Sequence, residues 1–469
     1  MSLTGLTLAQ AAAGVAQGDF TATELAEAAL ARIAAVNPKL NAFIRVEEDT
    51  VRKGAAAVDA QRAQGERLGP LAGAPLAHKD MYYRAGGLTT CGSAIRRDFR
   101  PEITATVLTR LERAGATYLG GLNMAEFAMG PTGHNEHFGP CRNPWDTDRI
   151  TGGSSSGSGS ATAARLCYGT LGSDTGGSIR LPAGFCHLVG MKPTQTRVSR
   201  FGVMGLSFSL DNVGPLTRTV LDNALMLAAI AGRDPLDPTS ARVATEDYAA
   251  AARAPRASGV RVGVVRGFFE KDADEPALAA RDSALAALVS AGAQPVEVEV
   301  GDMARINALS APLTACEAAT LHAHWLRERR ADYGAQMRAR CEMGFRFSAV
   351  EYLAALQLRP RIVADFADRV FSVCDVLLAP TFNIATPTIE DTDVRASQGF
   401  EAVLARISRC TRPFNYLTLP GLALPTPEAV LGMPGSVQLI GRPFGEASLY
   451  SLGAAYEAET GFPDREPPL

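Results

Sequence analysis

The spacing of apolar residues along the chain follows two periods, and the two periods predict different elements. Helical spacing or Ala-rich composition predicts helices at residues 23–33, 47–64, 104–114, 275–291, 302–330 and 348–369. Short apolar or alternating runs predict strands at residues 73–80, 117–122, 168–172, 259–265, 296–300, 375–379 and 436–440. Asn37-Pro38 is expected to end the first helix, because proline has no backbone N–H to donate. Interleaved helices and strands indicate an α/β layered fold.

Composition and charge narrow the class of protein. Hydrophobic residues make up 46% and charged residues 20% of the chain, which excludes a wholly disordered protein. The net charge of −3 gives no basic excess for nucleic acid or an anionic membrane. No apolar run is long enough to span a bilayer, and the first twenty residues do not have the pattern of a signal peptide. The eight cysteines are dispersed without a CxxC pair, so we expect a reducing, cytoplasmic location.

Two Gly- and Ser-rich segments stand close together, at residues 152–159 and 173–180. The segment between them is helix-prone at residues 161–166 and strand-like at residues 168–172. A flexible linker would not enclose such elements, and tight turns of this composition are typical of a built site. The sequence therefore predicts a functional site around these two turns.

Three other motifs in this region are weaker. Residues 152–157 have the outline of a phosphate-binding loop, but Ser158 stands where that loop needs lysine. Residues 153–157 also fit G-x-S-x-G, without the preceding strand that a nucleophile elbow requires. His134 and His137 lack the H-E-x-x-H order and a third ligand, so we interpret them as a hydrogen-bonded loop pair and predict no metal.

Lys79 ends an apolar run that is predicted to be a buried strand. Three interpretations are open: an ion pair with neighbouring Asp80, a side chain that reaches water, or a desolvated, neutral amine. A neutral amine is a general base, because burial lowers the pKa of lysine. A serine nucleophile needs such a base, and no histidine stands in a convincing context, so a Ser-Lys mechanism fits the residues present.

The chain resembles the amidase signature family. The matching stretches are residues 76–80, 122–130, 152–155, 172–180, 189–193, 209–215 and 438–441. The resemblance implies an α/β fold with a large mixed β-sheet core covered by helices on both faces. It also implies one amidase domain over residues 1–469, with a catalytic core at residues 70–220 and a more variable, substrate-shaping region at residues 235–410.

The family has a Ser–cis-Ser–Lys catalytic triad, and the resemblance assigns it residue by residue. Lys79 resembles the base, Ser154 the bridging serine on a cis peptide bond, and Ser178 the nucleophile. The 24 positions from Ser154 to Ser178 match the family pattern without a gap. The resemblance implies an oxyanion hole made by the backbone N–H groups of Thr175, Gly176, Gly177 and Ser178.

Further residues surround the implied triad. Asp174 and Arg180 flank the nucleophile turn, and we expect them to form an ion pair that braces it. Ser155 is expected to hydrogen-bond Ser154 or the nucleophile turn. For contact with the substrate we expect Met129, Gly130 and the loop 131–138.

The implied function is an amidohydrolase that cleaves a carboxamide C–N bond through a Ser178 acyl-enzyme and releases ammonia or an amine. The alternative is the glutaminase (A) subunit of a glutamine-dependent aminoacyl-tRNA amidotransferase. That subunit should have an acidic residue just before the stretch aligned with residues 412–415, and residues 404–411 contain none, which favours a stand-alone amidase. Arg340 aligns loosely with a carboxylate-binding arginine of that subunit, which leaves an acidic substrate open, but we favour its interpretation as a solvated helix charge.

The same resemblance sets the expected partners. We expect no cofactor and no metal, a small-molecule amide substrate, and neither a nucleic-acid nor a membrane partner. A homodimer is left open. Aliphatic, aryl, carbamoyl and amino-acid amides all remain compatible with the motifs. A non-catalytic binding protein on this fold is disfavoured, because Lys79, Ser154 and Ser178 are all present.

Overall fold

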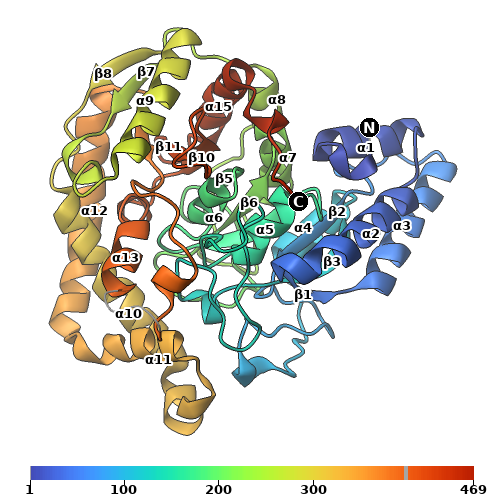
Figure 1. Cartoon of the computed structure of the whole chain (residues 1–469), viewed down its shortest axis with the longest axis horizontal. Helices are drawn as coiled ribbons and strands as arrows, with labels where there is room; N and C mark the ends of the chain where they lie inside the picture. Colours follow the sequence, from blue (N-terminus) through green and yellow to red (C-terminus); the bar gives the residue numbers. More distant parts are fainter. Residues whose placement is uncertain (1, 396–399) are drawn as a thin grey trace.

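One mixed β-sheet runs through the molecule (Figure 1). The computed structural model describes residues 2–395 and 400–469. Within these residues the sheet has eleven strands in the order β1-β3-β2-β4-β6-β5-β10-β11-β9-β7-β8. The strands are β1 (Phe43–Val46), β2 (Pro75–Lys79), β3 (Thr117–Leu122), β4 (Thr170–Asp174), β5 (Val189–Lys192), β6 (Asn212–Thr217), β7 (Arg261–Val264), β8 (Gln294–Glu297), β9 (Val376–Pro380), β10 (Gly421–Pro425) and β11 (Ser436–Ile440).

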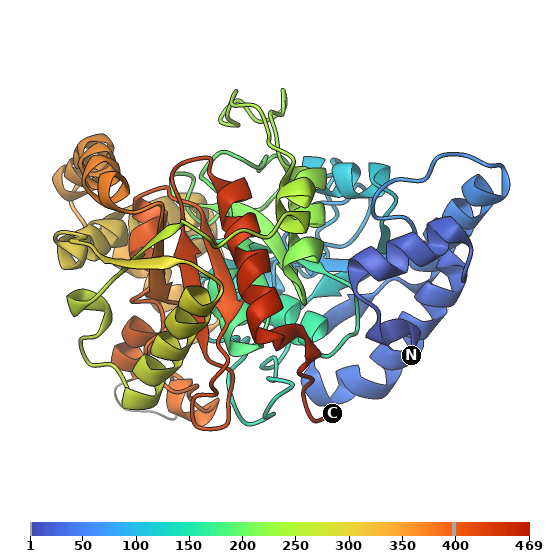
Figure 2. The same ribbon diagram turned by 90° about the horizontal axis from the view of Figure 1, so that it is seen from above.

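Helices cover both faces of this sheet, as the view from above shows (Figure 2). They are α1 (Leu8–Gln17), α2 (Ala22–Leu40), α3 (Glu48–Ala63), α4 (Thr106–Arg113), α5 (Ser156–Ala163), α6 (Arg180–Phe185), α7 (Val220–Ile230), α8 (Tyr248–Arg253), α9 (Glu275–Ser290), α10 (Met303–Glu328), α11 (Ala335–Glu342), α12 (Ala349–Val373), α13 (Phe400–Ile407), α14 (Arg412–Tyr416) and α15 (Glu446–Thr460). The predicted α/β class, with a mixed sheet covered on both faces, is confirmed.

Strand pairing at the centre of the sheet positions the predicted site. β2 pairs in parallel with both β3 and β4, and every residue of β2 and β4 is buried. Parallel strands place their carboxyl ends at one edge of a sheet. Lys79, at the end of β2, and Asp174, at the end of β4, therefore lie at the same edge of the sheet.

The Gly- and Ser-rich first turn leads directly into a helix, α5, which begins earlier than the sequence pattern predicts. All eight residues of α5 are buried. A Cβ atom at Gly157 would lie 2.3 Å from the carbonyl oxygen of Ala42 and 2.6 Å from the backbone nitrogen of Asn123. Small residues are needed here because the helix packs directly on neighbouring backbone. Tertiary packing therefore overrides the weak helix propensity of glycine and serine.

The predicted elements match the structure with local exceptions. Residues 117–122 and 436–440 form β3 and β11 as predicted, and β7-α9-β8 is a parallel βαβ unit. The prediction that Asn37-Pro38 ends the first helix is wrong, because α2 continues to Leu40. A proline in the last turn removes only one backbone hydrogen bond, and the helix then ends at Asn41 in the left-handed conformation (φ 52°).

Candidate active site

Lys79 lies buried beneath the two Gly/Ser turns. Its side chain is 1% exposed, and Nζ donates to Ser154 Oγ at 2.7 Å and to Ser173 Oγ at 2.8 Å. Burial lowers the pKa of Lys79 to about 7, although the negative charges of Asp211 and Asp174 act in the opposite direction. A lysine with this pKa is partly neutral near pH 7 and can accept a proton.

Asp80 does not form the ion pair with Lys79 that was one interpretation of the sequence. Its carboxylate accepts hydrogen bonds from Thr90 N at 2.8 Å and Thr90 Oγ1 at 2.5 Å, and it pairs with Arg45 at 3.2 Å. Successive residues at a strand end point to opposite faces of the sheet, which separates the two side chains. The Lys79 amine instead donates its hydrogen bonds to two serine hydroxyl groups.

The first turn brings Ser154 to Lys79 and Ser155 to the neighbouring strand. The Gly153–Ser154 peptide bond is cis. A Cβ atom at Gly153 would lie 2.7 Å from the carbonyl oxygen of Gly130, so only glycine fits there. Ser155 Oγ accepts from Ser173 N at 3.2 Å and lies 3.3 Å from the Ser173 carbonyl oxygen. Ser155 thus joins the first turn to the end of β4, directly before the second turn.

The second turn, residues 174–180, is braced by a buried ion pair between Asp174 and Arg180. Arg180 Nε donates to Asp174 Oδ2 at 3.0 Å, and both side chains are 0% exposed. Asn415 Nδ2 also donates to Asp174 Oδ1 at 2.8 Å. Burial by itself would raise the pKa of Asp174, but the Arg180 guanidinium, together with Lys192 and Asn415, lowers that pKa to about 2. Asp174 is therefore a fixed anion at the base of the turn that carries Ser178.

One member of the predicted oxyanion hole is already engaged. Gly177 N donates to Asp174 Oδ1 at 2.8 Å, so in this structure it braces the turn. Gly177 also has a φ of 134°, and a Cβ atom there would lie 2.3 Å from Thr411 Oγ1. The predicted donors left for an oxyanion are the N–H groups of Thr175, Gly176 and Ser178.

Ser178 opens onto a small cavity of about 50 Å³. Met129 and Gly130, predicted to contact the substrate, line this cavity, and so do Thr175 and Gly176. The sequence-predicted residues that line this cavity thus come from the segment after β3 and from the second turn.

Two arginines from separate helices complete the wall of the Ser178 cavity. Arg340 comes from α11 and Arg412 from α14. Burial, together with the positive charge of Arg340, lowers the pKa of Arg412 to about 10. Arg340, interpreted from the sequence as a solvated helix charge, is half-buried and lines this cavity. Sequence reasoning missed Arg412, because no local pattern around residues 412–415 marks a side chain that reaches the nucleophile.

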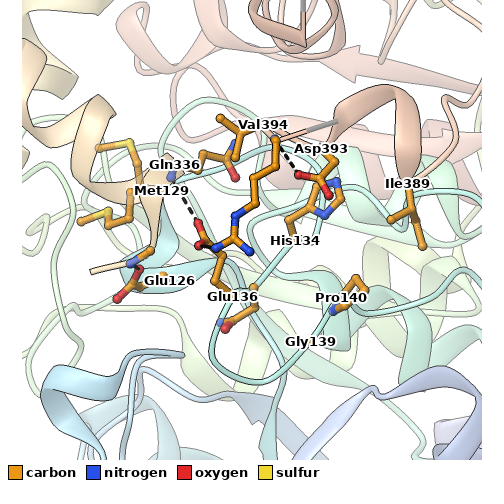
Figure 3. Close-up of a pocket in the computed structure, with 14 residues that line it drawn as sticks. Glu126, Met129, His134, Glu136, Gly139, Pro140, Gln336, Ile389, Asp393 and Val394 are labelled. Carbon is orange, nitrogen blue, oxygen red and sulfur yellow. Dashed lines mark hydrogen bonds and ion pairs between the residues drawn. The ribbon is translucent and has the colours of Figure 1, made fainter. Parts of the chain in front are cut away.

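A second cavity, of about 280 Å³, lies beside the first and shares Met129 with it. Its lining includes the ionisable side chains of Glu126, Glu136, His134 and Asp393 (Figure 3). His134 Nε2 hydrogen-bonds Thr392 Oγ1 at 2.9 Å.

The two histidines of the loop 131–138 bind protein partners separately. His137 Nε2 lies 3.0 Å from Glu126 Oε1, whereas His134 contacts Thr392 from a different segment. Across residues 2–395 and 400–469, no group of three or more His, Cys, Asp or Glu residues could hold a metal ion. The loop is therefore tied to its surroundings by hydrogen bonds.

Comparison with known proteins identifies the family. The family model described as Amidase matches residues 24–450, so the chain belongs to the amidase family. The chain is 41% identical to the A subunit of Glutamyl-tRNA(Gln) amidotransferase from Anaeromyxobacter sp. (strain K), over 97% of this chain and 96% of that protein. It is an amidase signature amidohydrolase by this membership.

Solved structures support the same family assignment. One, described as a vestigial protein complex that reveals the evolutionary origins of an s-triazine catabolic enzyme, is 36% identical with a TM-score of 0.90 over 97% of this chain and 98% of that chain. The Glutamyl-tRNA(Gln) amidotransferase A subunit from Thermotoga maritima is 30% identical with a TM-score of 0.80, over 97% and 95%.

These comparisons correct one prediction. We expected no nucleic acid among the partners of the chain, and this is wrong. The relatives that match almost the whole chain at 39–41% identity have a name that includes both a tRNA and a subunit role. Net charge misled the prediction, because it is a property of the whole chain and does not report on a particular partner.

Two features of the chain bear on its cellular location. Within the described residues, no helix is both long and apolar enough to cross a membrane. All eight cysteines are free thiols. The cytoplasmic location stays a prediction.

Proposed function

We propose that this chain hydrolyses a carboxamide through an acyl-enzyme on Ser178, with Lys79 as the base and Ser154 as the proton relay. The observation that carries the proposal is the 2.7 Å hydrogen bond between the buried Lys79 amine and Ser154 Oγ. A serine hydroxyl is a weak nucleophile until a base accepts its proton, and this amine has a pKa near neutrality.

In the proposed reaction, neutral Lys79 takes the proton of Ser154, which takes the proton of Ser178 as Ser178 Oγ attacks the carbonyl carbon. The N–H groups of Thr175, Gly176 and Ser178 stabilise the oxyanion, and each such donor contributes on the order of 3 kcal/mol. The C–N bond then breaks, and the proton returns through Ser154 to the leaving nitrogen. Water attacks the acyl ester by the same relay, which releases the carboxylic acid and restores Ser178.

The relatives support a particular version of this reaction, the glutaminase (A) subunit of a glutamine-dependent aminoacyl-tRNA amidotransferase. Glutamine supplies the amide, and ammonia leaves for transfer to a tRNA-bound acyl group on a partner subunit. Arg340 in the wall of the Ser178 cavity is suited to bind the α-carboxylate of glutamine.

Two measurements test this proposal. A fluorophosphonate should label Ser178, with peptide mapping to locate the adduct and Ser178→Ala as control; an adduct on another serine would overturn the assignment. Ammonia release from glutamine should then be measured with and without the partner subunits and tRNA of an amidotransferase. Glutamine hydrolysis that is stimulated by these partners supports the subunit role.

The Ser178 cavity also favours a second candidate, a stand-alone hydrolase of small, carboxylate-bearing amides. Among the described residues that line the cavity there are two arginines and no carboxylate, so the ammonium group of glutamine has no anionic partner there. Residues 404–411 do reach the cavity, through Ser408, which accepts a hydrogen bond from Arg412 at 2.6 Å. The cavity-lining side chain of this segment is thus a hydroxyl, and none of residues 404–411 is acidic.

One matched pair of substrates separates the two candidates. Glutaramate is glutamine without its amino group, so the two differ at the ammonium alone. A higher kcat/KM for glutamine supports the amidotransferase subunit, and a higher kcat/KM for glutaramate, without any partner protein, supports the stand-alone hydrolase.

A further inference from the structure

We infer that Glu136 is a positioning residue for substrate recognition: it holds the start of α11 so that Arg340, on the last turn of that helix, faces the Ser178 cavity. The inference rests on the proposed function, because it takes the Ser178 cavity to receive a substrate carboxylate. Both candidate functions share that feature. Glu136 lines the larger neighbouring cavity and lies outside the Ser178 cavity.

Two glutamates meet the N-terminus of α11. Gly334 N donates to Glu126 Oε2 at 2.8 Å, and Gln336 N donates to Glu136 Oε1 at 3.4 Å. The first N–H groups of a helix have no partner within the helix, and the positive end of the helix dipole favours negative charge. The two carboxylates therefore stabilise this end of a helix that is only eight residues long.

The helix rests directly against both carboxylates. A Cβ atom at Gly334 would lie 3.0 Å from Glu126 Oε2 and 3.0 Å from Glu136 Oε1. Gly334 has a φ of −61°, which any residue adopts, so alanine at this position meets a contact conflict and no backbone strain. Gly334→Ala can therefore displace α11 by a change at the start of the helix, with Glu136 left intact.

Glu136 also connects α11 to two other segments. It forms an ion pair with Arg395, at the end of the segment 389–395. Its own loop, 131–138, follows Met129 and Gly130 directly in the chain, and those two residues line the Ser178 cavity. Figure 3 shows Glu136 extending towards Gln336. The Glu136 carboxylate thus links α11, which carries Arg340, to the loop that follows Met129 and Gly130.

Of the two glutamates, Glu136 is the one that can be tested cleanly. Glu126 is 5% exposed and binds Ser93, His137 and Gly334 together, so its removal would disturb the fold. The Glu136 side chain is 23% exposed. A glutamine at this position keeps the shape and an acceptor oxygen and removes only the charge.

The test compares Glu136→Gln and Gly334→Ala with wild type on glutamine, glutaramate and pentanamide, in which a methyl group replaces the carboxylate of glutaramate. For the preferred carboxylate substrate we expect KM to rise about tenfold with kcat within about twofold, because substrate binding and not the chemistry is displaced. Hydrolysis of pentanamide should change less than about twofold.

Glu342→Gln is the matched control. Glu342 is the last residue of the same helix and pairs with Arg330 at 2.6 Å, far from the N-terminus. We expect it to leave all three substrates unaffected. A double-mutant cycle with Arg340→Ala completes the design: Glu136→Gln should add nothing to the KM of the carboxylate substrate once Arg340 is removed.

The outcomes distinguish a failure of the proposed function from a failure of the positioning role. If Arg340→Ala leaves the carboxylate preference of wild type intact, both the assignment of this cavity and the role of Glu136 are overturned. If Arg340 carries the preference but Glu136→Gln has no effect, is additive with Arg340→Ala, or slows pentanamide equally, only the positioning role is overturned.

Discussion

The turn that carries Ser178 and the helix that carries Arg340 line one cavity but are held in opposite ways. The turn is braced by Asp174 and Arg180, both 0% exposed. The start of α11 is held by two glutamates, the buried Glu126 and Glu136, whose side chain is 23% exposed and whose ion-pair partner Arg395 is 69% exposed. Removing one partner from a buried ion pair costs about 3–5 kcal/mol, whereas exposed pairs contribute about 0–1 kcal/mol. The turn that carries Ser178 is thus braced by a wholly buried ion pair, whereas part of the support of α11 is exposed to solvent.

The largest expected effect on activity comes from a comparison of two buried lysines, Lys79 and Lys192. Burial lowers the pKa of both Lys79 and Lys192 to about 7, but only Lys79 donates to serine hydroxyls. Lys192 Nζ donates to the carbonyl oxygen of Pro193 at 3.1 Å. We expect Lys79→Met to lower kcat by about 10³-fold or more, as losses from such triads do.

Lys192→Met is the control for the loss of a buried amine, and its kcat should stay within about tenfold of wild type. Ammonia release and circular dichroism should be measured on both variants. Equal losses in two folded variants would mean that burial of a lysine, and not the contact with Ser154, matters for activity.

Asp174→Asn tests the rigid side of the comparison. The change leaves the Arg180 guanidinium buried without its anion, so we expect the free energy of unfolding to fall by about 3–5 kcal/mol. Chemical denaturation measures this, with Asp365→Asn in the exposed pair with Arg361 as control. A loss below about 1 kcal/mol for Asp174→Asn would contradict the bracing role.

The pH dependence follows from the Lys79 pKa of about 7. The base must be neutral to act, so kcat/KM should fall about tenfold per pH unit below pH 7 and level off above it. Profiles between pH 5 and 9 test this limb, and the residual activity of Lys79→Met should lack it. A wild-type profile that is flat from pH 5 to 7 would exclude Lys79 as the base.

Arg412→Gln tests the part of the Ser178 cavity lined by the two arginines, and it gives the smallest expected effect. Loss of one guanidinium should raise the KM for glutaramate about tenfold, with little change in kcat. Pentanamide hydrolysis serves as the internal reference, since it has no anion to bind. If both substrates lose kcat equally, Arg412 supports the turn and does not select the substrate.

Short local motifs in the sequence were enough to predict the candidate site residues and several strands. Lys79, Ser154 and Ser178 each lie in a short Gly- or strand-flanked segment whose residue types are dictated by backbone geometry, and that signal is visible in sequence. The strands β3 and β11 were predictable for the same reason, because a short apolar run is a local property of the sequence. Membership of the family extended these positions to a shared fold.

Only the tertiary structure decided which long-range partners meet. Arg340 and Arg412 come from α11 and α14, more than 150 positions after Ser178, and nothing local marks them as neighbours of the nucleophile. The partner of Asp80 is Arg45 and not the adjacent Lys79. Short-range residue patterns encode the turns and strands that hold the nucleophile. The charge of the cavity depends on packing between distant helices, which a single sequence does not reveal.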